Sequence, residues 1–188
     1  MAKVRLELES IEILAKRSKW NLYFICYTNH PEDPSKSLMR LLPKTGTIQL
    51  TKKSDNPYSF KPKGEGSDGL KVYQNELNQD KEVVIRLCMM QSRKRLRNTA
   101  EVLADVKEQL TIKGLKDILT LSRLQWFVVD AGIDVLTKSL SKIKDRELGF
   151  ISMDEEFGEE FKKNPNQKRT KKISSGKAKL TWIWDLKD

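Results

Sequence analysis

The sequence predicts a mainly β protein of the α+β class: an antiparallel β-sandwich of about eight strands with a helical insertion before the last strands. Three observations predict this fold. Strand-like patterns fill most of residues 3–90, the apolar periodicity becomes helical over 98–144, and strict alternation returns over 177–186. With 188 residues, the chain suits a single domain, with the sandwich in 1–97 and 146–188 and the insertion between them.

The composition and net charge limit the classes of function that the protein can have. Charged residues make up 33% of the chain and hydrophobic residues 38%, which is typical of a folded protein. The formal net charge of +10 favours attraction to nucleic acid, anionic lipid or acidic protein. The first segment, MAKVRLELES, is strand-like and contains no apolar run of signal-peptide length. We therefore expect a cytoplasmic protein, peripheral at a membrane if its partner is lipid.

The first strands are indicated by apolar residues with a period of two. In residues 3–13 these side chains alternate through Leu8 and continue from Ile11 in the opposite phase, so a β-bulge is expected at the two residues between them. Residues 20–27 are apolar on both faces, which predicts a central strand covered on both sides. Further strand patterns occupy residues 37–42, 47–50, 70–77 and 82–90.

Two cysteines, Cys26 and Cys88, lie inside apolar strand patterns and lack the spacing of metal ligands. They are interpreted as small buried hydrophobic residues that stay reduced. No metal site and no cofactor site is predicted.

The helical insertion begins near Asn98, which forms a capping-box pattern with Glu101. Within it, residues 124–143 carry an apolar arc so broad that most of the helix must be covered. This segment is interpreted as a core helix, and an interface helix in a larger assembly is the alternative.

The end of the chain contains a charged region followed by a strand. The acidic stretch 154–160 lacks the spacing of a calcium loop and is interpreted as a solvated turn. Residues 162–176 are basic and contain Pro, Asn, Ser and Gly, which predicts an irregular, mobile linker. Its cations are expected to make secondary electrostatic contacts: Lys168, Arg169, Lys171 and Lys172.

Several of these segments together resemble the calcium- and lipid-binding β-sandwich modules of protein kinase C and synaptotagmin type. The resemblance rests on the bent first strand, the aromatic-rich second strand, an NPY turn at 56–58, the apolar strand at 82–90, the stretch RELGFISM at 146–153 and the final strand. It implies a lipid-binding sandwich with calcium-binding aspartates after the strand at 82–90.

The chain departs from that pattern at the expected calcium ligands. It has SRKRLR after the strand at 82–90 and AKRSK after the first strand, and cations cannot supply the oxygen ligands that calcium needs. We therefore predict a calcium-independent basic rim that docks on an anionic membrane or an acidic protein. Its residues are Lys16, Arg17, Lys19, Arg93, Lys94, Arg95 and Arg97.

Two other functions stay open. The same basic segments could bind nucleic acid, with aromatic residues stacking on bases if they are exposed: Trp20, Tyr23, Tyr58, Phe60 and Tyr73. Most of these residues, however, fall at strand positions that are expected to be buried. Alternatively, the chain is a structural subunit or effector module with helix 124–143 at an interface. Catalysis is not expected, because the single histidine, His30, lies in a proline-rich turn and no nucleophile motif accompanies it.

Overall fold

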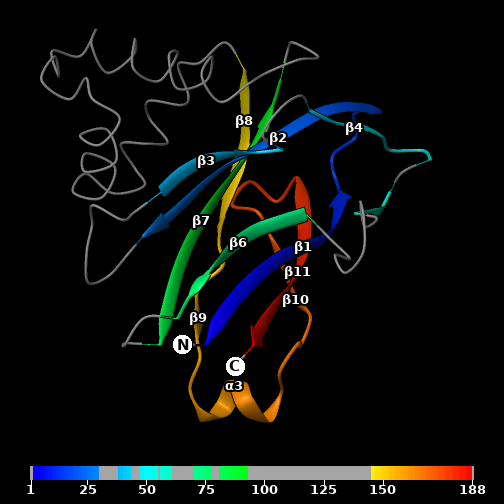
Figure 1. Ribbon diagram of the computed structural model, residues 1–188. Helices are drawn as coiled ribbons and strands as arrows, with labels where there is room; N and C mark the ends of the chain where they lie inside the picture. Colours follow the sequence, from blue (N-terminus) through cyan, green and yellow to red (C-terminus); the bar gives the residue numbers. More distant parts are fainter. Residues whose placement is uncertain are drawn as a thin grey trace, which may run out of the picture. The chain divides into compact units, whose positions relative to one another are not determined.

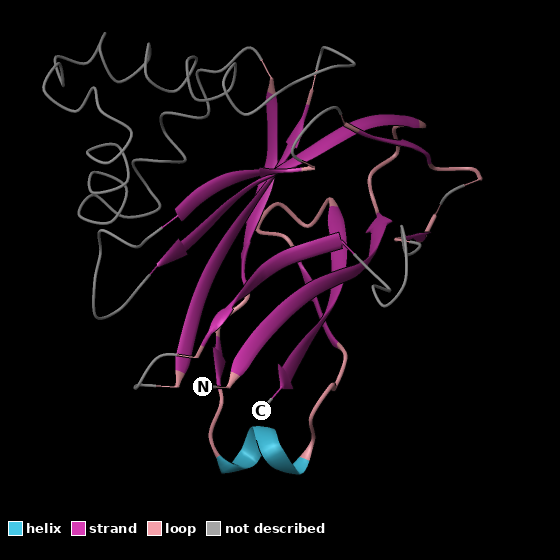
Figure 2. Ribbon diagram, in the orientation of Figure 1, coloured by secondary structure: helices cyan, strands magenta, loops and turns pink. Residues whose placement is uncertain are grey.

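The computed structural model describes residues 2–29, 38–43, 47–54, 56–60, 70–77, 81–92 and 145–187. These residues form two antiparallel sheets and one short helix, which confirms the predicted mainly β class and fits a β-sandwich (Figure 1). Figure 2 shows that strands make up most of the described chain, with a short helix and connecting loops. The elements are β1 Lys3–Ile13, β2 Lys19–Asn29, β3 Leu38–Leu42, β4 Ile48–Thr51, β5 Tyr58–Ser59, β6 Leu70–Glu76, β7 Glu82–Gln91, β8 Arg146–Ser152, β9 Glu155–Glu156, α3 Glu159–Lys163, β10 Arg169–Lys172 and β11 Ala178–Lys187.

The five-stranded sheet is built around β1. Its order is β10-β11-β1-β5, and β6 also pairs with β1. The predicted bulge is confirmed: Leu8 pairs with Trp182 and Ser10 with Thr181, so Glu9 is the extra residue. The bulge restores the inward phase, and β1 presents five fully buried apolar side chains to the core: Val4, Leu6, Leu8, Ile11 and Ile13.

The last strand, β11, supplies the largest core side chain of this sheet. Trp184 is completely buried and meets Phe157 edge-on, with ring centroids 5.3 Å apart. It also meets Tyr73 on β6 at 6.3 Å. The predicted alternation is confirmed, because Ala178, Leu180, Trp182 and Trp184 are all buried.

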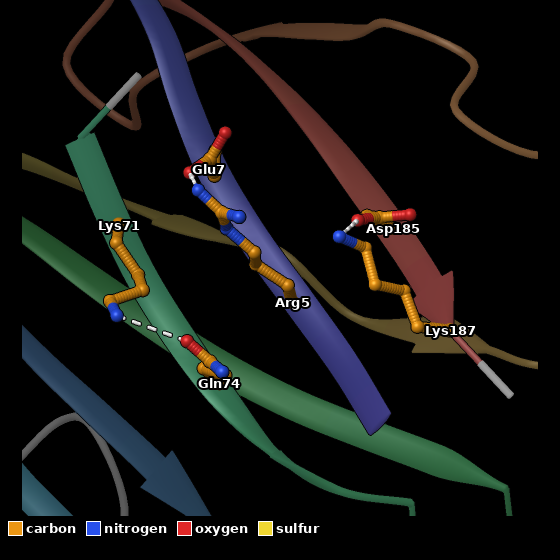
Figure 3. A network of polar contacts seen from close by, with 6 residues as sticks. All are labelled: Arg5, Glu7, Lys71, Gln74, Asp185 and Lys187. Atoms are coloured by element: carbon orange, nitrogen blue, oxygen red, sulfur yellow. Dashed lines mark hydrogen bonds and ion pairs between the residues drawn. The ribbon is translucent and has the colours of Figure 1, made fainter. Parts of the chain in front are cut away.

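On the outward surface of this sheet near the start of β1, several charged side chains contact polar side chains of their own strand. Arg5 forms an ion pair with Glu7 on the same strand, and its cross-strand neighbours are Gln74 and Asp185 (Figure 3). Gln74 accepts a hydrogen bond from Lys71 at 3.0 Å, and Asp185 pairs with Lys187 at 3.7 Å. Arg5, Lys71 and Lys187 therefore have polar partners on their own strands.

The six-stranded sheet has the order β3-β2-β7-β8, with β4 paired to β2 and β9 paired to β7. Strand β2 is interior in this order, and its residues from Leu22 to Thr28 are all buried, which confirms the prediction of a central, doubly covered strand. Both cysteines are free and buried, Cys26 on β2 and Cys88 on β7, as predicted.

One prediction about the C-terminal region is wrong, and a second is wrong in part. Residues 162–176 do not form an irregular linker, because Arg169–Lys172 are the strand β10, paired in register with β11 (Figure 1). The acidic stretch 154–160 is solvated at Asp154, Glu156, Glu159 and Glu160, but it is not a simple turn. It contains β9, the start of α3 and the fully packed ring of Phe157, which is 1% exposed. In both cases burial of a few apolar residues organises a highly charged segment.

Several predictions fall outside the described residues. They are the helical insertion 98–144 with its apolar helix 124–143, the basic residues Arg93, Lys94, Arg95 and Arg97, and His30. Among the residues that the structure does describe, no helix is long and apolar enough to cross a membrane.

Candidate functional site

The loop between β1 and β2 carries the first part of the predicted rim. Lys16 and Arg17 lie in this loop and Lys19 opens β2, and all three are exposed. The loop is held by the β10–β11 hairpin, because the backbone N–H groups of Leu14 and Ala15 both donate to the carbonyl oxygen of Lys177, at 2.8 and 3.2 Å. A shared acceptor of this kind fixes where the loop leaves the sheet.

A second turn, residues 52–54 after β4, binds to the same loop. The backbone N–H of Lys52 donates to the carbonyl oxygen of Ser18 at 2.8 Å, and its ammonium Nζ donates to the carbonyl oxygen of Ala15 at 2.9 Å. These bonds place Lys52 against the loop and bring the exposed Lys53 next to it.

Three turns that are distant in sequence thus meet. We name their cations the basic loop surface: Lys16, Arg17, Lys19, Lys52, Lys53 and Lys177. Lys16, Arg17 and Lys19 were predicted from the sequence, and the other three were not. No local signal marks Lys52, Lys53 and Lys177, because only strand pairing brings their turns to this place.

The cations of this surface differ from those near the start of β1. In the described ranges, no carboxylate lies within 4 Å of the charged ends of Lys16, Arg17, Lys19 and Lys53. Glu12, on the adjoining strand β1, is already paired with Lys179 at 2.5 Å. Like charges held close together repel one another, and an anion bound between them relieves that repulsion.

Arg17 is oriented by the neighbouring strand. Its guanidinium lies 5.9 Å from the centroid of the Trp20 ring, and the indole Nε1–H of Trp20 donates to the backbone carbonyl of Arg17 at 2.9 Å. The ring is 4% exposed and therefore rigid. A cation on a fixed aromatic face loses less conformational freedom when it binds an anion.

The other half of the predicted rim cannot be placed in the same way. Its residues, Arg93, Lys94, Arg95 and Arg97, follow Ser92, whose backbone N–H donates to the carbonyl oxygen of Asn21 at 2.8 Å. Asn21 lies two residues after Lys19 on β2. The meeting of the two basic segments stays a prediction.

The four cations of 162–176 that were predicted to make secondary electrostatic contacts divide into two kinds. Lys168 pairs with Glu9 at 2.9 Å, and Arg169 pairs with Glu155 at 2.6 Å, with its guanidinium 5.7 Å from the centroid of the Phe161 ring. Burial raises the pKa of the Glu155 carboxyl, and Arg169 partly opposes that rise. These two cations serve the fold. Lys171 and Lys172 are exposed on β10.

Other surface features are less informative. A cavity of about 580 Å³ beside α3 is lined by charged residues of both signs, among them Glu159, Lys163 and Arg169. In the part of the chain with a described structure, no group of three or more His, Cys, Asp or Glu residues is placed to hold a metal ion.

The aromatic residues considered for base stacking are mostly inside the protein. Trp20, Tyr23 and Tyr73 are 4%, 1% and 9% exposed, and Tyr58 and Phe60 are half-buried against each other in an edge-to-face contact with ring centroids 5.2 Å apart. The expected burial is confirmed for Trp20, Tyr23 and Tyr73, so these three rings do not meet the condition of exposure that base stacking requires.

Comparison with known proteins does not assign the chain to a family. No protein-family model matches the sequence, and no curated protein matches it. Among solved structures, one described as Drosophila C2-DSL-EGF1 aligns with 99% of this chain and 67% of its own, at 6% sequence identity and a TM-score of 0.41. A likeness at that TM-score carries no argument about fold or function.

Proposed function

We propose that this protein is a non-enzymatic, calcium-independent binding module that docks on an anionic surface through the basic loop surface. One observation carries the proposal. Backbone hydrogen bonds join three separate basic turns, and the described residues offer most of their cations no carboxylate partner. Structural ion pairs do not account for this arrangement, whereas an external anion does.

The expected strength follows from the number of charges. Each lysine or arginine near an anionic membrane surface contributes about 1 kcal/mol, so the six cations of the surface together would give about 6 kcal/mol, a dissociation constant of tens of micromolar. The interaction is electrostatic and falls as salt rises. The proposed partners are an anionic membrane or an acidic protein, and the proposed location is the cytoplasm, at a membrane when the partner is lipid.

The alternatives have weaker support. Nucleic-acid binding by the same cations is disfavoured by the burial of Trp20, Tyr23 and Tyr73, because base stacking requires exposed rings. A role as a subunit of a larger assembly rests on helix 124–143, which lies outside the described residues. The resemblance to the sandwich modules of protein kinase C and synaptotagmin type remains a proposal.

A pair of variants with equal net charge tests the proposal. The surface variant carries Lys16→Glu, Arg17→Glu and Lys53→Glu, and the control carries Lys3→Glu, Lys71→Glu and Lys163→Glu at other exposed positions. Both have a formal net charge of +4 in place of +10. Binding is measured to vesicles of phosphatidylcholine with and without phosphatidylserine and to immobilised polyglutamate, in EDTA at constant ionic strength.

The two variants should differ clearly in their affinity for the anionic target. We expect the surface variant to lose at least about tenfold in affinity for whichever anionic target binds the protein, and the control to lose much less. Equal losses would show that net charge alone drives the attraction. If the unsubstituted protein binds neither target, the proposed function is wrong.

A further inference from the structure

Two large apolar side chains stand out at the surface of the described residues. Leu14 is 38% exposed and Phe150 is 36% exposed. Isolated apolar residues at a surface need no explanation, but these two share a location. Both border the turn of the β10–β11 hairpin, residues 174–177, which also contributes Lys177 to the basic loop surface.

Hydrogen bonds from opposite ends of the turn hold the two residues. At one end, the N–H of Leu14 donates to the carbonyl oxygen of Lys177 at 2.8 Å. At the other, the N–H of Ser174 donates to the carbonyl oxygen of Phe150 at 2.8 Å, and the N–H of Phe150 donates to Ser174 Oγ at 3.0 Å. The turn thus connects the β1–β2 loop to β8.

Gly149 makes the contact with β8 close. A Cβ atom at this position would lie 2.9 Å from Ser174 Oγ and 3.1 Å from the backbone nitrogen of Ser175, and its φ of +144° suits glycine. The backbone of β8 therefore approaches the turn more closely than a side chain would allow. This approach holds Phe150, the next residue, at the edge of the turn.

Three cations belong to the same loop and turn as this apolar pair. Lys16 and Arg17 follow Leu14 by two and three residues in the same loop, and Lys177 lies in the turn itself. The long stems of lysine and arginine can lie along an apolar surface while their charges reach outward. Apolar and cationic residues thus occur together in the β1–β2 loop and at the hairpin turn to which it is bonded.

We propose that Leu14 and Phe150 insert into the interfacial region of an anionic bilayer while Lys16, Arg17 and Lys177 contact lipid phosphates. This inference rests on the proposed docking function and names its partner as lipid. A bilayer presents anionic groups directly above an apolar layer, and both halves of the surface find a partner there. A nucleic-acid backbone or an acidic protein surface would satisfy the cations and leave the two apolar side chains in water.

The first test removes the apolar pair and leaves every charge in place. The variant Leu14→Ala/Phe150→Ala should lose about tenfold in its partition onto vesicles containing phosphatidylserine, because less apolar area is transferred from water. Its binding to polyglutamate should stay unchanged. The control Leu77→Ala alters a half-buried leucine at the other end of β1, where its N–H bonds to the carbonyl oxygen of Ala2, and should leave partition unchanged.

The second test measures whether the side chains at positions 14 and 150 enter the bilayer. Its readout is the polarity around a fluorophore and not the affinity of the protein for vesicles. An environment-sensitive fluorophore is attached in turn to Leu14→Cys, Phe150→Cys and the control Lys3→Cys. The native Cys26 and Cys88 are 0% and 6% exposed, so the new thiol is the accessible target among the described cysteines. We expect a blue shift on anionic vesicles at positions 14 and 150 and no shift at position 3.

The outcomes separate this inference from the proposed function. If vesicles bind but labels at 14 and 150 stay in a polar environment, insertion is wrong and electrostatic docking stands. If polyglutamate binds and vesicles do not, lipid is the wrong partner and the docking function survives. Failure to bind either target overturns both proposals.

Discussion

The side-chain amide of Asn56 forms two hydrogen bonds with the backbone of Ile13, the last residue of β1. The N–H of Ile13 donates to Oδ1 at 2.7 Å, and Nδ2 donates to the carbonyl oxygen of Ile13 at 3.0 Å. One side chain thus satisfies both backbone groups at the residue before Leu14. It anchors the segment after the turn 52–54 to the strand end from which the basic loop starts.

Removing this amide should destabilise the protein. We expect Asn56→Ala to lower the free energy of unfolding by about 1–3 kcal/mol, because two partly buried backbone groups lose their partner. Asn56→Asp keeps the acceptor and loses the donor. Its free energy of unfolding should therefore lie between those of the unsubstituted protein and Asn56→Ala. Urea denaturation followed by tryptophan fluorescence measures the change.

Asn75 provides the matched control for this substitution. Its Oδ1 accepts only a local hydrogen bond from the N–H of Glu76 at 3.0 Å, on an exposed stretch of β6. Asn75→Ala should therefore change the free energy of unfolding by less than about 0.5 kcal/mol. An equal effect of the two substitutions would show that the Asn56 anchor contributes nothing specific.

Two glycines of the hairpin region should respond differently to alanine. At Gly149 a Cβ would lie 2.9 Å from Ser174 Oγ, and the backbone has a φ of +144°. We expect Gly149→Ala to cost at least about 2 kcal/mol of stability, since strain and steric conflict add. At Gly176, φ is +70° and no atom lies within 4 Å of the added Cβ, so Gly176→Ala should cost only about 1 kcal/mol.

Urea denaturation of the two alanine variants checks this difference. Gly176→Asn should recover part of the loss at that position, because asparagine tolerates a positive φ better than alanine does. No such recovery is expected for Gly149→Asn, where space is also lacking. Equal costs at both glycines would contradict the close approach of β8 to the turn.

The carboxyl group of Glu155 should make stability depend on pH. Burial raises its pKa above the usual 4.5, so the folded protein favours the protonated form more than the unfolded chain does. Its contribution to stability is fully present below pH 4.5 and is lost as pH rises through the folded pKa. Relative to the unsubstituted protein, Glu155→Gln should therefore gain stability across that window, as measured by urea denaturation at successive pH values.

Glu159 provides a control of opposite sign. A hydrogen bond and the positive charge of Lys162 lower the pKa of its carboxyl group, so its contribution is present above pH 4.5 and is lost as pH falls through the folded pKa. Relative to the unsubstituted protein, Glu159→Gln should lose stability as pH rises from the lowered folded pKa of Glu159 to 4.5, a window that lies below that of Glu155. Profiles of the same sign for both variants would contradict the burial of Glu155.

The basic loop surface and the paired cations near the start of β1 show why charge counts alone say little about binding. Arg5 and Lys187 have carboxylate partners on their own strands, and Lys71 bonds to Gln74 (Figure 3). The described carboxylates leave Lys16, Arg17 and Lys53 without such partners. Because an ion pair already made inside the protein weakens attraction to an outside anion, the second group carries the proposed function.

The sequence by itself determined the features that depend on short-range pattern. The phase change between Leu8 and Ile11 predicted the bulge at Glu9, the continuous apolar run of β2 predicted its burial, and the alternation of β11 predicted which tryptophans face the core. Side chains in a strand point to alternate faces, so these properties can be deduced from neighbouring residues alone.

The tertiary structure decided what charged segments do. Lys168, Arg169 and their neighbours have the composition of a linker, yet pairing with β11 makes part of that segment a strand, and Glu9 and Glu155 supply partners from far along the chain. Likewise, Lys52 and Lys177 join the loop of Lys16 through hydrogen bonds to its backbone from distant turns. Charge at a residue is local, whereas its partner is set by the path of the whole chain, and for this reason composition cannot distinguish a structural cation from one available to a ligand.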